Sequence, residues 1–221
     1  GNPNSWTKEL KQKNIKVVHV VSSVKFAIKA ESSGVDAIVA EGFEAGGHNG
    51  IEETTTMCLV PDVAKAINVP LIAACGIIDG KSMLAAMILG ADGVQMGTRF
   101  VASKESSAHE NFKNMVLKAK EGDTRLTLKE ITPVRMMKNK FYKEVEELYK
   151  SSPSKEQLLN KLGRGRAKLG MFEGDLEAGE LEIGQASSQI NRVFTAQEIV
   201  QQIMTEFNSI KSQMSIANKF N

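Results

Sequence analysis

The apolar positions in the first half of the chain form short runs that alternate with segments of helical periodicity. The runs typical of strands are residues 15–21, 37–40, 71–75 and 93–100, the last of which continues into a loop. The segments with apolar positions at helical spacing are residues 24–32, 59–67 and 82–89. This alternation predicts four βα units in a row, which is typical of a parallel sheet.

Such a sheet belongs either to a doubly wound fold or to a (β/α)₈ TIM barrel. Four parallel strands do not close a barrel, and a half barrel on its own leaves two open edges and an uncovered core. A complete barrel of this type needs about 250 residues. We therefore expect an α/β chain that forms the C-terminal half of a (β/α)₈ barrel, with the N-terminal strands absent from this sequence.

The pattern changes after about residue 105. Residues 105–121 predict a charged helix, and residues 132–149 carry apolar positions at roughly helical spacing. Ser154 and Gln157 predict a capping box at the start of a further helix. The sequence thus favours a helical substrate or lid subdomain over residues 106–190, after a barrel half over residues 1–105.

A last helix is predicted to pack back on the barrel from residues 191–221. Thr195 and Glu198 predict a capping box at its start. Its apolar positions recur on one face: Ile199, Ile203, Phe207, Ile210 and Met214.

Composition restricts the class of protein. The chain has 221 residues, is 42% hydrophobic and 24% charged, and carries a net charge of +2. This charge is too small to indicate a nucleic-acid or membrane partner, and no apolar run approaches the ~18 residues of a membrane span. Cys58 and Cys75 predict free thiols in a reducing compartment, so we expect a cytoplasmic protein. The polar N-terminus predicts no signal peptide, and the absence of an initiator methionine suggests that the natural start lies elsewhere.

Residues 41–50 carry the densest candidate chemistry. They directly follow a predicted strand, and they combine four glycines with Glu41, Glu44 and His48. Glycine lets a backbone approach a ligand closely, and a loop held by a strand is a common place for chemistry. The alternative is a glycine-rich turn with a solvated histidine.

Two further loops are candidates for phosphate binding. If the four strands are the fifth to eighth of a barrel, residues 75–80 and 97–99 follow the strands where barrels often hold phosphate. Gly76 and Gly97 offer backbone N–H groups, and Thr98 adds a hydroxyl. The first loop leads into a helix whose N-terminus is expected to favour an anion.

The motifs at residues 44–50, 72–77 and 93–100, with residues 104–106, resemble one flavin family in order and spacing. It is the nitronate monooxygenase family, formerly called 2-nitropropane dioxygenase, which also contains the FMN-dependent enoyl-ACP reductase II. The resemblance covers essentially the whole chain, including Gly184 and Gln185. It implies a (β/α)₈ barrel with an inserted helical domain and FMN at the C-terminal ends of the strands.

The resemblance also implies roles for individual residues. His48 matches the catalytic or substrate-orienting histidine, and no metal is implied. The positions implied to bind the cofactor are Glu41, Gly46, Gly47, Cys75, Gly76, Gly97 and Thr98. One of them departs from the family, which usually has glycine where this chain has Cys75. Its side chain either crowds the phosphate loop or points into the barrel.

The implied activity is FMN-dependent oxidoreduction by a cytoplasmic flavoprotein, and two enzyme activities of the family compete for the assignment.

 The residues 97–100 with 104–106, and the form of the helical region, favour NAD(P)H-dependent reduction of enoyl thioesters in fatty acid biosynthesis. The alternative is a nitronate monooxygenase that oxidises alkyl nitronates with O₂. An inactive fragment without flavin and a flavin-free phosphate-binding barrel isomerase are hypotheses from other classes. The expected partners are a small-molecule or acyl-carrier-linked substrate and a second copy of the chain in a homodimer.

The remaining candidate residues favour structural roles. We expect His19 to be packed in a strand, His109 to be exposed on a charged helix, and Cys58 to lie in the core. The adjacent Met136 and Met137 predict packing, although methionines also line substrate tunnels. The basic residues between 161 and 168 predict a solvated face, or a surface that contacts NADPH phosphates or an acidic carrier protein.

Overall fold

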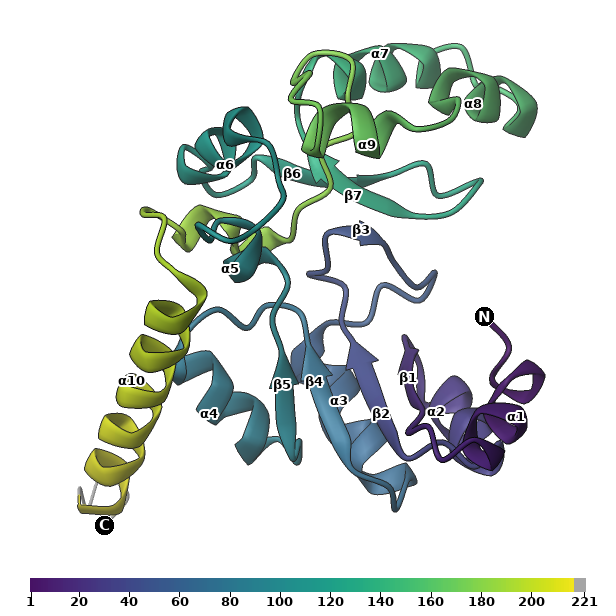
Figure 1. Cartoon of the computed structure of the whole chain (residues 1–221). Helices are drawn as coiled ribbons and strands as arrows, with labels where there is room; N and C mark the ends of the chain where they lie inside the picture. The colour runs from purple at the N-terminus through teal and green to yellow at the C-terminus, as the bar shows by residue number, and fades with distance from the viewer. Residues whose placement is uncertain (217–221) are drawn as a thin grey trace. The chain divides into compact units, whose positions relative to one another are not determined.

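The computed structural model describes residues 1–216, which divide into two compact units (Figure 1). Unit 1 comprises residues 1–44, 52–96 and the chain from Val200 onward, and unit 2 comprises residues 45–51 and 97–199. The chain therefore passes from one unit to the other four times. Each unit has its own sheet.

The sheet of unit 1 is parallel and has four strands in the order β1-β2-β4-β5. The strands are β1 (Val18–Val21), β2 (Ala37–Glu41), β4 (Leu71–Ala74) and β5 (Gly93–Gln95). Their register pairs Val18 with Ala37, Ile38 with Leu71, and Ile72 with Gly93. The prediction of four βα units is confirmed. Each strand lies beside the preceding strand of this sheet, whereas a doubly wound sheet reverses its order.

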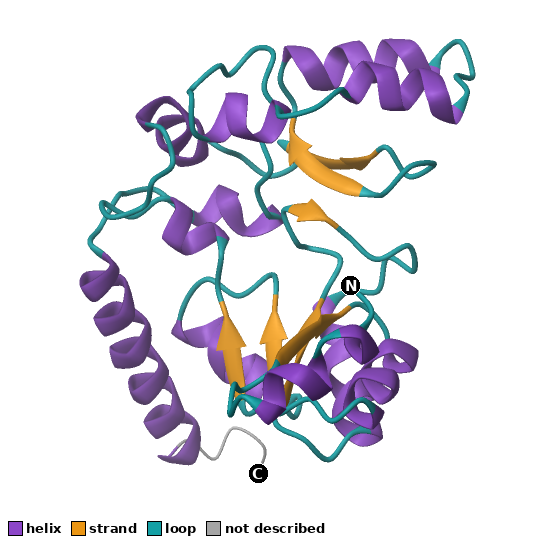
Figure 2. Ribbon diagram, turned by 45° about the vertical axis from the view of Figure 1, so that its right-hand side comes forward, coloured by secondary structure: helices purple, strands orange, loops and turns teal. Residues whose placement is uncertain are grey.

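Helices accompany these strands (Figure 2). They are η1 (Pro3–Ser5), α1 (Thr7–Gln12), α2 (Val24–Ser32), α3 (Thr56–Ala66), α4 (Gly80–Ile88) and α10 (Ala196–Ile216), the last from Val200 onward. Helix α2 has its predicted bounds because its ends are capped locally. The Ser23 side chain accepts a hydrogen bond from the N–H of Phe26, and Gly34 takes a positive φ of 82° just after the last turn.

The core of unit 1 lies between the sheet and its helices. Its fully buried members include Ala27, Ile38, Ala40, Val60, Val63 and Ala73. Strand β1 is an edge of this sheet, and its Val18 and Val20 are 50% and 46% exposed. His19 is half-buried between them, and burial is the main cause that lowers its pKa. The expectation of a packed strand histidine holds only in part.

Unit 2 contains an antiparallel sheet that the sequence did not predict. Its strands, in the order β3-β7-β6, are β3 (Gly47–His48), β7 (Val134–Met137) and β6 (Thr124–Thr127). The prediction of a helix over residues 132–149 is therefore wrong for its first half. Met136 and Met137 lie in the central strand and are buried, which confirms their packing role.

Short helices complete unit 2. They are α5 (Thr98–Val101), α6 (Glu110–Leu117), α7 (Lys140–Tyr149), α8 (Lys155–Leu162), α9 (Arg166–Met171) and η2 (Gln185–Gln189). A core cluster lies on one face of the sheet and consists of Leu128, Val134, Met136, Phe141, Val145 and Leu158. The region predicted to be purely helical is thus a mixed sheet and helix structure.

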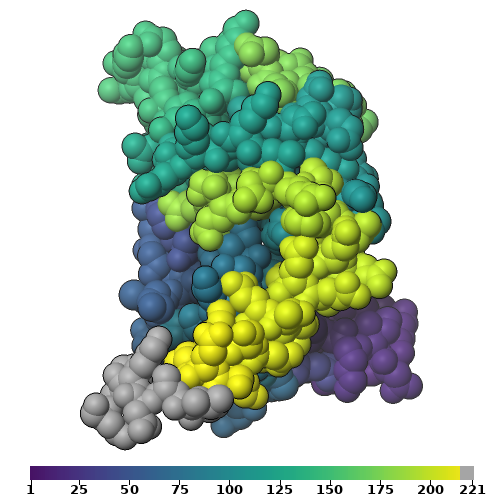
Figure 3. All heavy atoms as spheres, turned by 90° about the vertical axis from the view of Figure 1, so that its left-hand side faces the viewer, coloured from purple at the N-terminus to yellow at the C-terminus, as the bar shows by residue number. Residues whose placement is uncertain are grey.

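Both predicted capping boxes are confirmed. Ser154 and Gln157 bond reciprocally at the start of α8. Thr195 and Glu198 do the same at the start of α10, with N–H to oxygen distances of 2.7 and 3.1 Å. Of the predicted apolar face of α10, Ile199, Ile203 and Phe207 are buried, but Met214 is exposed. In Figure 3 this helix, in yellow, lies at the surface with its outer side uncovered.

Two single-residue expectations are wrong. Cys58 is exposed on α3 and is not a core residue, because Leu59, Val60 and Val63 form the buried side of this helix. His109 is half-buried, and its Nδ1 accepts a hydrogen bond of 3.1 Å from the N–H of Asn111 at the start of α6. It is a capping residue, so the charged helix begins only at Glu110.

Candidate functional site

The carboxyl ends of the parallel strands bring several predicted residues together in unit 1. Glu41 ends β2 and lies opposite Ala74, the last residue of β4. The N–H of Gly42 donates to the carbonyl of Ala74 at 3.2 Å, so the loop after β2 starts beside Cys75. In open α/β sheets this edge is where ligands bind.

Glu44 closes this loop. Its Oε2 accepts hydrogen bonds from the backbone N–H of Thr56 at 3.0 Å and from the Thr56 hydroxyl at 2.9 Å. The same hydroxyl lies 3.1 Å from the carbonyl oxygen of Cys75. A Cβ at Gly42 would lie 2.1 Å from the Thr56 hydroxyl oxygen, so only glycine fits there. Glu44 therefore ties the loop after β2 to the start of α3 and to the loop after β4.

The loop after β4 turns through two consecutive residues in the left-handed region. The φ angles of Cys75 and Gly76 are 84° and 68°. Glycine takes this conformation without strain, whereas a residue with a Cβ pays about 1–2 kcal/mol. The backbone conformation at position 75 therefore favours glycine, the residue type that the family usually has there.

The N-terminus of α4 is already paired with carboxylates. Asp79 caps it and accepts a hydrogen bond of 2.8 Å from the N–H of Ser82. The N–H of Gly80 donates to Oε2 of Glu206 at 2.8 Å. Two carboxylates therefore occupy two N–H donors at this helix end, and their negative charge opposes the binding of a phosphate there.

In unit 2, two predicted loops converge on Gly184. A Cβ at Gly46 would lie 2.4 Å from the carbonyl carbon of Ile183 and 2.5 Å from the nitrogen of Gly184. The N–H of Gly184 donates to the Thr98 hydroxyl oxygen at 3.1 Å. The hydroxyl still has its own hydrogen to donate. A Cβ at Gly97 would meet nothing within 4 Å, so the backbone there borders open space.

His48 is exposed on β3, which pairs with β7 through Gly47–Arg135 and His48–Val134. Glu182 lies next to it. Its Oε2 lies 2.8 Å from the position that a Cβ at Gly47 would take. Burial raises the pKa of Glu182, and the nearby charge of His48 opposes that rise. The sequence analysis did not identify Glu182.

Asn49 fixes the chain after His48. Its N–H donates to the carbonyl of Pro133 at 2.9 Å, and its Nδ2 donates to the carbonyls of Ala45 and Gly47 at 3.0 Å each. Its Oδ1 is buried without a hydrogen-bond partner within the described part of the chain. A buried acceptor of this kind has the chemistry to receive an N–H or O–H group from a ligand.

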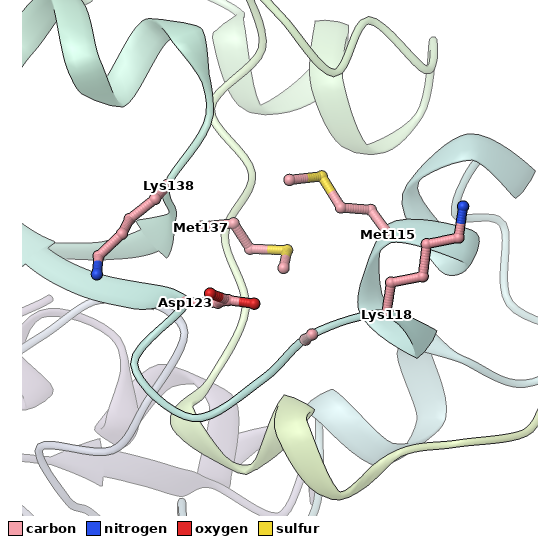
Figure 4. A pocket seen from close by; sticks show the side chains of 6 residues that line it. Met115, Lys118, Asp123, Met137 and Lys138 are labelled. Atoms are coloured by element: carbon pink, nitrogen blue, oxygen red, sulfur yellow. The ribbon is translucent and has the colours of Figure 1, made fainter.

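A cavity of about 210 Å³ lies elsewhere in unit 2 (Figure 4). Its lining residues are Met115, Lys118, Ala119, Asp123, Met137 and Lys138, and they include no predicted site residue. Sites for small molecules usually measure about 300–1,000 Å³. The cavity is therefore small for a nucleotide cofactor.

The basic side chains near α9 are largely paired within unit 2. Lys161 lies 2.6 Å from Glu144, and Lys168 lies 3.2 Å from Glu173. Arg166 stacks on the ring of Phe141 at 4.3 Å from its centroid. Among residues 1–216 no group of His, Cys, Asp and Glu is placed to hold a metal ion. The same part of the chain contains no helix with the length and apolar character needed to cross a membrane.

Comparison with known proteins decides the family. The family model for nitronate monooxygenase matches residues 1–206. The chain belongs to the nitronate monooxygenase family. A probable nitronate monooxygenase of Staphylococcus saprophyticus is 35% identical over 219 residues, covering 93% of this chain and 60% of that protein. The resemblance found in the motifs is confirmed.

Solved structures extend this comparison to the fold. FabK from Thermotoga maritima matches with a TM-score of 0.91 and 40% identity, over 97% of this chain and 68% of that one. A nitroalkane oxidase from Streptomyces ansochromogenes matches with a TM-score of 0.78 and 26% identity, over 96% and 62%. This member of the nitronate monooxygenase family spans about three fifths of the length of its curated relatives. Its α/β fold matches a portion of these barrel structures.

The family is FMN-dependent, and the residues present fit a phosphorylated cofactor. The backbone of Gly97 borders open space, and the Thr98 hydroxyl retains a hydrogen to donate. Cys75 and Gly76 form a left-handed turn at the carboxyl edge of the sheet in unit 1. Turns with such backbone conformations can direct successive N–H groups toward an anion.

Proposed function

We propose that this protein is an FMN-dependent oxidoreductase that uses NAD(P)H to reduce enoyl thioesters in fatty acid biosynthesis. The observation that supports it is the 40% identity and TM-score of 0.91 to FabK, the enoyl-ACP reductase II, from Thermotoga maritima over 97% of the chain. The substrate would be a small or acyl-carrier-linked thioester. The protein would act as a homodimer.

The proposal assigns the cofactor-binding groups unit by unit. In unit 1 they are Glu41, Cys75 and Gly76, and in unit 2 they are Gly46, Gly47, Gly97 and Thr98. Bound FMN supplies hydride transfer. The Gly97 backbone and the Thr98 hydroxyl would donate hydrogen bonds to the phosphate, with Thr98 held in place by the N–H of Gly184.

His48 is the proposed catalytic residue. Its side chain is exposed, and its strand β3 pairs with β7. The next residue, Asn49, donates its backbone N–H to the carbonyl of Pro133 and so fixes the chain after His48. In the reductase its imidazole would give a proton to the substrate carbon that does not receive the hydride. In the alternative enzyme it would take a proton from the carbon that bears the nitro group.

The sheet of unit 1 is proposed to be the C-terminal half of a (β/α)₈ barrel. Its strands are parallel and follow the chain order, and β1 presents an exposed edge with Val18 and Val20 uncovered. Under this proposal, residues 1–105 contain the barrel half, residues 106–190 the substrate subdomain, and residues 191–221 the helix that packs back on the barrel. Residues 217–221 lie outside the part of the chain that the structure describes.

Nitronate oxidation with O₂ is the second candidate. Curated relatives at 35–36% identity are named probable nitronate monooxygenases. The two activities separate cleanly in assay. The reductase consumes NAD(P)H with crotonyl thioesters, whereas the monooxygenase consumes oxygen with alkyl nitronates and needs no NAD(P)H.

The first test is a visible absorption spectrum of the purified protein with added FMN, followed by NADPH without oxygen. Bound flavin whose bands bleach rapidly supports the reductase. Bound flavin that does not bleach favours nitronate oxidation. Protein that never binds flavin overturns both enzymes and leaves the inactive fragment.

The role of His48 is tested by H48Q in whichever of the two assays shows turnover. Loss of a positioned acid or base lowers kcat by about 10²–10⁴-fold, while flavin binding should persist. The matched control is H109N, because asparagine can replace His109 as the cap of α6. Equal activity of H48Q and wild type would contradict the assignment.

A further inference from the structure

The edge of β7 that carries β3 also carries Glu182. Strand β6 occupies one whole edge of β7, from Val134 to Met137. On the other edge, β3 pairs with Val134 and Arg135. Beyond β3 on that edge, Glu182 forms an antiparallel bridge with Met136, and the N–H of Met137 donates to Leu181 at 2.9 Å.

This register places His48 and Glu182 two positions apart along the same edge of β7. His48 lies opposite Val134 and Glu182 lies opposite Met136, two positions further along β7. Two positions span about 7 Å. Glu180 lies two residues before Glu182, and Glu180, Glu182 and His48 are here called the row of titratable residues.

The exposure of the side chains increases along this row from Glu180 to His48. Glu180 is 7% exposed, Glu182 is half-buried and His48 is exposed. The Oε2 of Glu182 lies 2.8 Å from the Cβ position of Gly47, so its carboxylate leans along the edge toward β3. The side chain of Glu182 thus ends beside the residue that precedes His48.

Different charged groups act on the two carboxyls of this row. At the inner end, the pKa of Glu180 is raised to about 7, first by burial and then by Glu182, and Arg166 opposes the rise. At the outer end, His48 is the charged group that opposes the rise in the pKa of Glu182. Two neighbouring buried carboxyls do not both ionise readily, so the more buried Glu180 keeps a proton more readily. Glu182 is the carboxyl of the pair whose ionised form the charge of His48 favours.

We propose that Glu182 is a positioning residue for His48, whose carboxylate stabilises the imidazolium form of that side chain. The inference rests on the proposed function of His48. When His48 takes a proton from a substrate carbon, the C–H bond breaks, an N–H bond forms, and the new cation faces an existing anion. In the reductase the same anion holds the imidazolium until it gives its proton to the substrate.

The coupling is tested by ¹³C NMR titration of the Glu182 carboxyl, with E182Q used to assign its signal. In H48Q the titration of Glu182 should move to higher pH, because the cation that favours its ionised form is gone. In H109N it should match wild type. Identical titrations in H48Q and wild type would overturn the proposal. This measurement needs neither flavin nor substrate, so its failure is distinct from failure of the proposed function.

Kinetics test the consequence for catalysis. E182Q should lower kcat about 10-fold or more with little change in KM and should alter the pH profile of kcat, because loss of an ion pair to the imidazolium costs roughly 1.4 kcal/mol or more. E177Q, a change of an exposed glutamate in the same unit, should behave as wild type. If E182Q keeps the wild-type kcat and pH profile while H48Q is inactive, His48 retains its proposed role and Glu182 loses its own.

Discussion

Cys75 has a backbone conformation that is unfavourable for a residue with a side chain. Its φ of 84° is a conformation that glycine adopts freely, and its neighbour Gly76 shares that region. The side chain does not prevent the left-handed turn, but it raises the free energy of the folded state. The sequence alone showed the departure from glycine and could not show its φ, since φ depends on the loop that Glu44 and Thr56 hold.

C75G should therefore stabilise the protein. Relief of left-handed strain gains about 1–2 kcal/mol, and the greater entropy of glycine in the unfolded chain offsets up to about 1 kcal/mol. Urea unfolding monitored by circular dichroism measures the difference. C58G is the matched control and should destabilise by about 0.3 kcal/mol, because Cys58 lies in α3 and glycine has a lower helix propensity than cysteine. Destabilisation by C75G would contradict the strain argument.

Substitutions at two glycines of the candidate site should have separate effects, one on FMN binding and the other on the stability of the fold. G97A adds a methyl group into open space at a negative φ of −94°, so the fold should stay intact while FMN binding weakens. G46A places a Cβ within 2.4 Å of backbone at Ile183 and should destabilise by about 1–3 kcal/mol. Thermal unfolding and FMN titration report the two effects. Unchanged FMN affinity in G97A would remove Gly97 from the proposed site.

At the scale of elements, helices that begin at a local capping signal were predicted correctly, whereas strands that depend on long-range pairing were not. Helices α2, α8 and α10 begin at capping residues that are visible in the sequence. Strand β7 was predicted as helix because all four of its residues are buried, which removes the alternation that marks a strand. Strand β3 has two residues and exists only through its partner β7.

Asp36 links the first helix to the first strand and gives unit 1 a pH dependence. It accepts hydrogen bonds from the N–H of Val17 at 2.9 Å, from Lys11 at 3.0 Å and from Lys16 at 3.2 Å. The Val17 bond is the main cause that lowers its pKa to about 2, followed by the bond from Lys11.

Because the folded state lowers this pKa, the linkage stabilises the protein above the unfolded value of about 4. That contribution should be lost as the pH falls from about 4 toward 2, and D36N should show less acid sensitivity in this window. Denaturant unfolding at stepped pH measures it. D62N, at an exposed position of α3, is the control and should keep the wild-type profile.

At the scale of the whole molecule, the motifs predicted the candidate site residues but not which of them lie in contact. The His48 loop and the loop at Gly97 converge on Gly184, which lies more than eighty residues away from both along the chain. Glu182, the proposed partner of His48, lies where polar and apolar residues alternate, and no motif there marks it as a site residue. Long-range contacts of this kind depend on the path of the chain between elements, which local patterns do not encode.

The two units should respond separately to loss of core packing. Ile38 is fully buried in unit 1, and Phe141 is 1% exposed in unit 2. I38A and F141A each remove buried contacts that typically contribute about 2–5 kcal/mol. Hydrogen exchange should accelerate mainly in the unit that carries the substitution. Uniform acceleration across both units in either variant would show that they unfold as one.

The assignment of residues 45–51 to unit 2 restricts how the gene can be recombined. A fragment that starts at residue 97 would contain β6 and β7 but leave one edge of β7 without β3. A chimera with another family member would keep its hydrogen-bond ladders if residues 45–51 and 97–199 came from the same parent. The permissible crossover points then lie at the junctions 44/45, 51/52, 96/97 and 199/200, and substrate preference should follow the parent that supplies the two inner segments.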